Sequence, residues 1–144
     1  MTRVDRTMVT RRLAVVSRYL SLLTPHTTLT LNAYCADPRT RAVIERALQV
    51  SIEATLDVCK HFLRVLGVPR PKDAFDVIVA AGTGVIPEAL ARALAPAASL
   101  RNRLVHEYDD LDDAVVLAAV AEAGRLFPRY VAAVEAAVGR AGER

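Results

Sequence analysis

Residues 101 to 108 hold the side chains of this sequence that are best suited to chemistry, namely Arg101, Asn102, His106 and Tyr108. Arginine binds phosphate through a planar fork of N–H donors, and histidine exchanges a proton near neutral pH. Tyr108 adds a phenol hydroxyl close by. A strong cation next to an imidazole, without the cysteine and histidine spacing of a metal site, favours phosphodiester chemistry.

The spacing limits how these side chains could act together. On an ideal helix, at about 100° per residue, Arg101 and Tyr108 lie within about 20° of each other, whereas Arg101 and His106 are about 140° apart. Arg101 and His106 therefore do not share a face of a straight helix. Three arrangements would resolve this: the helix ends or distorts near His106, Arg101 reaches round it, or a second subunit completes the site.

The string Arg-Asn-x-x-x-His-x-Tyr at residues 101 to 108 resembles the signature of HepT-like toxins in the HEPN superfamily. An upstream helix at residues 45 to 61, the Asp-Ala-Phe at residues 73 to 75 and a long final helix are similar to that family in order and spacing. The resemblance covers roughly residues 8 to 135. It implies a single HEPN/HepT-like domain over residues 1–144.

The resemblance also implies an activity, a metal-independent endoribonuclease. The 2′-hydroxyl of RNA is the nucleophile, so cleavage needs proton transfer and stabilisation of negative charge on phosphorus. His106 would move the proton, Arg101 would hold the charge, and Asn102 would orient the phosphate or the imidazole. The products would be a 2′,3′-cyclic phosphate and a 5′-hydroxyl, and no cofactor is expected.

The resemblance to HepT-like toxins also implies a symmetric dimer with the motif in a cleft at the interface. We therefore expect a homodimer in which two copies of His106 approach one cleft. The matching tyrosine, Tyr108, is implied to be the target of an MntA-like minimal nucleotidyltransferase antitoxin, which transfers AMP from ATP to the phenol. A phosphate added so near His106 would block the RNA site by charge and bulk. The chain would then be the toxin of a toxin–antitoxin system.

Two other classes of function stay open. One is a catalytically silent HEPN module that binds a nucleotidyltransferase or nucleotides. The other is a plain helical interaction protein, in which His106 only marks a helix end, where a charged histidine is favoured by the helix dipole.

Composition is consistent with a cytoplasmic protein that has no membrane segment. The chain has 144 residues, a size that fits one domain, and a net charge of +3. Charged residues interrupt every long apolar run, and the first residues lack the apolar stretch of a signal peptide. Cys35 and Cys59 have no metal or disulfide spacing, so both are expected to be free thiols.

Apolar residues recur at three and four positions almost throughout, which predicts an all-α, HEPN-like up-and-down bundle of four to five helices. The predicted helices span about residues 5 to 22, 40 to 66, 73 to 80, from 87 through the motif, and 112 to 138. The second is apolar around much of its girth and should be central, with one stripe through Ile44, Leu48, Ile52, Leu56, Cys59, Leu63 and Leu66 and another that includes Val43. Pro96 is expected to kink or divide the motif helix, and Pro128 to bend the last one.

Acidic residues follow the motif, and Glu107, Asp109, Asp110, Asp112 and Asp113 invite a magnesium site. We prefer helix capping, with Asp110 as N-cap and Asp112 and Asp113 in the first turn of the last helix, where negative charge is stabilised. No metal is therefore expected.

Two further histidines lie outside the motif. Asp57 and His61 are spaced as a surface pair on a helix, although His61 could instead face the cleft. His26 lies in a Thr-rich loop without a partner that the sequence identifies.

Overall fold

The computed structural model describes residues 3–106 and 111–142 of the chain. In order along the chain, the helices of these residues are α1 (Arg6–Leu23), the 3-10 turn η1 (Thr24–His26), α2 (Leu31–Ala36), α3 (Pro38–Val65), α4 (Ala74–Ala81), α5 (Glu88–His106) and α6 (Asp113–Gly142). The part of the chain that is described contains no strand. The all-α prediction is confirmed, with one short helix more than expected.

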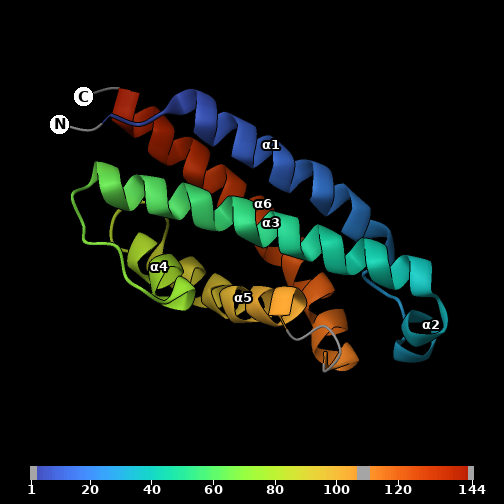
Figure 1. Ribbon diagram of the computed structural model, residues 1–144. Coiled ribbons are helices and arrows are strands. Elements are labelled where there is room, and N and C mark those ends of the chain that lie inside the picture. Colours follow the sequence, from blue (N-terminus) through green and yellow to red (C-terminus); the bar gives the residue numbers. More distant parts are fainter. Residues whose placement is uncertain (1–2, 107–110, 143–144) are drawn as a thin grey trace.

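The long helices α1, α3 and α6 form one side of the bundle, and α4 and α5 cover the other side of α3 (Figure 1). The start of α1 lies beside the end of α6, where Arg6 Nη2 donates to the carbonyl of Val138 at 3.4 Å. None of the helices within residues 3–106 and 111–142 has the length and apolar character needed to cross a bilayer.

Helix α3 is central, as the sequence predicts, because it packs against α1, α4, α5 and α6. It begins at Pro38, earlier than expected, since Asp37 caps it by accepting hydrogen bonds from the backbone N–H groups of Arg39 and Thr40. It ends before Gly67, whose φ of 72° favours glycine. Most of its apolar residues are buried, but Val43 and Leu66, near its two ends, are 42% and 43% exposed.

Helix α2 was not predicted, because six residues are too few to show a helical period. Thr30 caps it, and its Tyr34 is completely buried under the guanidinium of Arg41, 5.3 Å from the ring centroid. Burial, aided by the Glu45 carboxylate, raises the pKa of Tyr34 to about 12. This tyrosine therefore anchors α2 to the bundle.

Pro96 and Pro128 lie inside α5 and α6, and neither helix is divided there. Of the two outcomes expected at Pro96, a kink or a division of α5, the division does not occur. A proline leaves the carbonyl four residues earlier without its helical donor. Those residues, Arg92 and Gly124, are exposed, so water can satisfy both carbonyls.

Candidate functional site

Helix α5 carries most of the motif because it buries one face and exposes the other. Its apolar side packs into the core, and the polar side chains of Asn102 and His106 face solvent, with Arg101 half-buried. The buried residues of α5 are Leu90, Ala91, Leu94, Ala95, Ala98, Leu100 and Leu104. This amphipathic pattern is what orients the motif.

Arg101 is held against α3 by Glu53. Its Nε and Nη2 lie 3.2 Å and 3.1 Å from the same carboxylate oxygen, and its Nη1 donates to the side-chain oxygen of Asn102 at 3.3 Å. Gln49 donates to that Glu53 oxygen as well, at 3.3 Å. The side chains of Arg101 and Glu53 keep 30% and 37% of their surface exposed. The guanidinium is thus fixed in orientation and still open to a ligand.

His106 is the last residue of α5, and its side chain is exposed. Within the described residues no hydrogen bond or ion pair joins it to Arg101, which points to α3 and does not reach round its own helix. Because α5 is helical up to His106, the two side chains leave it about 140° apart. One subunit therefore does not bring Arg101 and His106 together.

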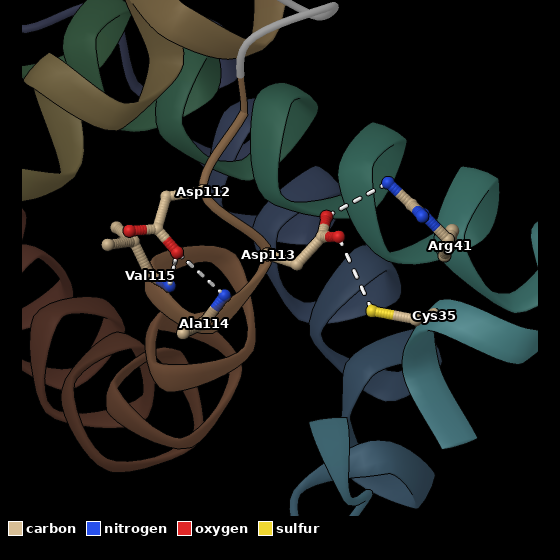
Figure 2. A network of polar contacts seen from close by, with 6 residues as sticks. All are labelled: Cys35, Arg41, Asp112, Asp113, Ala114 and Val115. Carbon is tan, nitrogen blue, oxygen red and sulfur yellow. Dashed lines mark hydrogen bonds and ion pairs between the residues drawn. The ribbon is translucent and has the colours of Figure 1, made fainter. Parts of the chain in front are cut away.

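Tyr108 lies outside the described residues, as do Glu107, Asp109 and Asp110. Figure 2 shows the contacts made at the start of α6. Asp112 caps α6 by accepting from the backbone N–H groups of Ala114 and Val115 at 3.0 Å and 3.4 Å. The N-cap is thus Asp112, one residue before the helix, and the expectation of Asp110 in that place is wrong.

Asp113 ties the start of α6 to α2 and α3 (Figure 2). Its carboxylate lies 2.9 Å from Arg41 Nη2 and accepts from Cys35 Sγ at 3.4 Å. Desolvation and the hydrogen bond to Asp113 raise the pKa of the Cys35 thiol, so this cysteine is a poor nucleophile. Cys35 and Cys59 are both free, as predicted. Across residues 3–106 and 111–142 no cluster of side chains is suited to hold a metal ion.

His61 is buried, only 4% exposed, and serves a structural role. Its Nε2 accepts from the backbone N–H of Asp5 at 2.8 Å. The predicted surface pair with Asp57 is wrong, because His61 turns into the core and Asp57 pairs with Arg12 at 3.2 Å. Desolvation and the Arg64 cation, 3.2 Å from Nδ1, lower the pKa of His61, although Asp5 opposes this shift.

The sequence does not reveal Glu53 as the partner of Arg101, or Gln49, which donates to Glu53. Both are polar residues on the solvent side of α3, a place where polar residues are common. Their link to Arg101 depends on how α5 packs against α3, which no local pattern reveals. His26, by contrast, lies in η1, away from this network.

An apolar groove runs beside the motif helix, between α3, α5 and α6, with a volume of about 240 Å³. Its walls include Pro96, Ala97 and Leu100 of α5 and Val115 and Ala119 of α6. Val115 is 41% exposed although it is apolar. An apolar surface of this kind is typical of a protein interface.

Comparison with known proteins gives concordant results. The family model described as "HepT-like: Ribonuclease HepT-like" matches residues 16–134. A tRNA nuclease HepT of Aphanizomenon flos-aquae is 33% identical over 132 residues, which cover 91% of this chain and 90% of that protein.

Two solved structures are similar in fold. One is a tri-AMPylated HEPN toxin of Shewanella oneidensis in complex with an MNT antitoxin, with a TM-score of 0.78 at 20% identity, covering 90% of this chain and 97% of that one. The other is a toxin–antitoxin crystal structure with AMP-PNP, with a TM-score of 0.80 at 19% identity, covering 91% and 99%.

Proposed function

The chain belongs to the HepT-like ribonuclease family, and on that premise we propose that it is a toxin that cleaves RNA with Arg101 and His106. The observation that carries this proposal is the fixed guanidinium of Arg101. Glu53 holds it on the surface of α3 while part of it stays open to solvent. A phosphodiester placed there meets a pre-oriented cation, which is the arrangement that stabilises developing charge on phosphorus.

The proposed reaction uses the substrate's own nucleophile. A histidine removes the proton of the 2′-hydroxyl, the oxygen attacks the adjacent phosphorus, and the bond from phosphorus to the 5′-oxygen breaks. A second acidic group donates a proton to the leaving 5′-oxygen. The products are a 2′,3′-cyclic phosphate and a 5′-hydroxyl, and Asn102 orients the phosphate beside Arg101. The reaction as proposed needs no metal ion.

A homodimer would supply what one subunit lacks. Arg101 and His106 leave α5 in directions about 140° apart, and each chain offers one motif histidine for two proton transfers. A second copy that packs on the apolar groove would bury Val115. It would also bring its own α5, with a second His106, to the cleft between the two copies. The position of the groove along α5 supports this arrangement.

We propose that an antitoxin inactivates this toxin by modifying Tyr108. The antitoxin would be an MntA-like minimal nucleotidyltransferase that joins AMP to the phenol oxygen and releases pyrophosphate from ATP. A structure of similar fold is described as a tri-AMPylated HEPN toxin with its MNT antitoxin. AMP at Tyr108, two residues beyond His106, would add negative charge where the RNA phosphate must bind.

The RNA to be tested first is tRNA, since a relative is named a tRNA nuclease. RNA and ATP occur together in the cytoplasm, where we expect the protein to act.

The mechanism can be tested by chemistry at the cleaved nucleotide. The protein is incubated in excess EDTA with tRNA, and with the same tRNA carrying one 2′-deoxynucleotide on the 5′ side of the expected cut. We expect cutting of the first to a cyclic phosphate and no cutting of the second at that position. Equal cutting of both would refute attack by the 2′-hydroxyl, and binding without cutting would favour a silent HEPN module.

A further inference from the structure

The two lysines of this chain, Lys60 and Lys72, line the same pocket. The pocket lies where α3 meets the loop before α4, and has a volume of about 300 Å³. Arg70 is the third cation of its lining, and Pro71, Ala74 and Val77 form an apolar wall. We call it the lysine pocket. All other basic residues of the chain, apart from histidines, are arginines, so the gathering of both lysines here is distinctive.

The positive charge of the lysine pocket is not compensated by its own lining. None of its lining residues is acidic, and within residues 3–106 and 111–142 no ion pair involves Lys60, Arg70 or Lys72. Asp73, the next residue along the chain, does not line the pocket, and its carboxylate caps α4 by accepting from the backbone N–H of Phe75 at 2.7 Å. The pocket is therefore suited to an anionic ligand.

The lysine pocket lies in line with the proposed active site. Lys60 follows Glu53 by two helical turns on α3, which places the two residues within about 20° around the helix and about 10 Å apart along it. Glu53 is the residue that holds Arg101. About 10 Å corresponds to roughly three phosphates of one strand, at about 3.4 Å each along a duplex axis.

The solvent face of α3 around this line is also basic. Its two nearby carboxylates, Glu53 and Asp57, are paired with Arg101 and Arg12. Arg46 and Arg64, which are exposed on the same helix, add positive charge. An RNA strand bound at Arg101 and running along α3 would thus lie beside further cations.

From these observations we propose that the lysine pocket binds the sugar–phosphate backbone of the RNA a few nucleotides away from the scissile bond. The inference rests on the proposed function and adds a second binding point to it. Lysine acts as a point charge without the fixed fork of arginine, so it suits a backbone that arrives in varied geometry. Contacts to phosphates position a nucleic acid and carry no sequence information. The pocket would therefore increase affinity for long RNA without selecting its sequence.

The test measures binding of fluorescent tRNA at several salt concentrations by the His106→Ala protein, which keeps the RNA intact. The variant adds Lys60→Gln and Lys72→Gln, and the matched control adds Arg11→Gln and Arg129→Gln, two exposed arginines outside the pocket. We expect the lysine variant to lose about tenfold in affinity and the slope of log K against log salt to fall by about one to two, as for two lost phosphate contacts. The control should lose much less.

A second readout separates this inference from the proposed function. With His106 intact, the lysine substitutions should raise the KM for tRNA about tenfold and leave the cleavage of a dinucleotide unchanged, since a dinucleotide is too short to reach the pocket. Wild-type affinity and salt slope in the lysine variant would overturn the inference and leave the proposed function intact. A parent protein that neither binds nor cuts RNA would overturn both.

Discussion

Arg101 and Glu53 join α5 to α3 through two guanidinium nitrogens, at 3.2 Å and 3.1 Å from one carboxylate oxygen. The third nitrogen, Nη1, is directed to Asn102. This contact fixes the plane of the guanidinium before any ligand arrives. The planar guanidinium of Arg101 binds phosphate through paired N–H groups, so its orientation matters for binding. Glu53, which sets that orientation, is therefore part of the proposed site.

Substitution Glu53→Gln tests that role. We expect kcat for RNA cleavage to fall about tenfold with little change in KM, because a cation that is present but misaligned loses transition-state stabilisation. Stability should change by less than about 1 kcal/mol, as is usual for a half-exposed ion pair. Steady-state kinetics and urea unfolding measure both effects.

The matched control is Glu88→Gln, which removes the carboxylate of an exposed ion pair with Arg92 on α5 and lies outside the groove. It should leave kcat unchanged. If Glu53→Gln also leaves kcat unchanged, or increases it, Glu53 does not position Arg101 for catalysis.

The buried His61 predicts a pH dependence of stability. Its pKa is lowered in the folded protein, so the unfolded chain takes up the proton first as pH falls. The free energy of unfolding should therefore decline once pH drops below about 6.5, the ordinary value for histidine, until the lower folded pKa is passed. Above that window His61 contributes no slope.

His61→Gln provides the comparison, because a glutamine carbonyl can accept from the Asp5 N–H and does not titrate in this range. Urea unfolding of both proteins from about pH 7.5 to about pH 5 should show the steeper decline in the wild type. Parallel curves would contradict a neutral, buried His61 that charges only on unfolding.

The apolar groove predicts the effect of a charge at the subunit interface. Val115→Arg puts a cation into the groove at a position that is already 41% exposed, so the fold should tolerate it. We expect the protein to sediment as a monomer and to lose RNA cleavage. Ala132→Arg, on an exposed part of α6 outside the groove, should remain dimeric and active. A dimeric Val115→Arg protein would place the interface elsewhere.

The proposed role of Tyr108 can be tested by AMPylation. Incubation with ATP and an MntA-like nucleotidyltransferase should add AMP to the wild type and stop RNA cleavage, whereas Tyr108→Phe should gain no AMP and stay active. Intact-mass analysis and a cleavage assay follow both events. AMP found on Tyr108→Phe would assign the modification to another residue.

The elements that could be predicted from sequence are those with a long apolar period. The apolar stripes of the central helix α3 and the long α6 predict both to within a few residues. Helix α2 was missed because its six residues hold one buried anchor, Tyr34, and no period. At Pro96 the sequence allowed a kink or a division, and α5 continues through it, with the carbonyl freed at the exposed Arg92 open to water.

The site was predictable only in part, for a related reason. Residues close in sequence, such as Arg101 and Asn102, are visible as a motif. The partner of Arg101 is Glu53, on a helix far earlier in the chain, and its identity depends on packing. The same limit applies to His61, which the sequence suggested as a surface residue and which packs instead against the start of α1.

The most direct test of the central claim is cleavage of tRNA in excess EDTA by the purified protein, by Arg101→Lys and by His106→Ala. We expect the unmodified wild type to cut, with the rate reduced by at least about a hundredfold in His106→Ala, the range typical of a lost general acid or base. Arg101→Lys keeps the charge and loses the fork, so it should also be strongly impaired. Wild-type rates in both variants, or no cutting by a protein whose mass shows an unmodified Tyr108, would contradict the account.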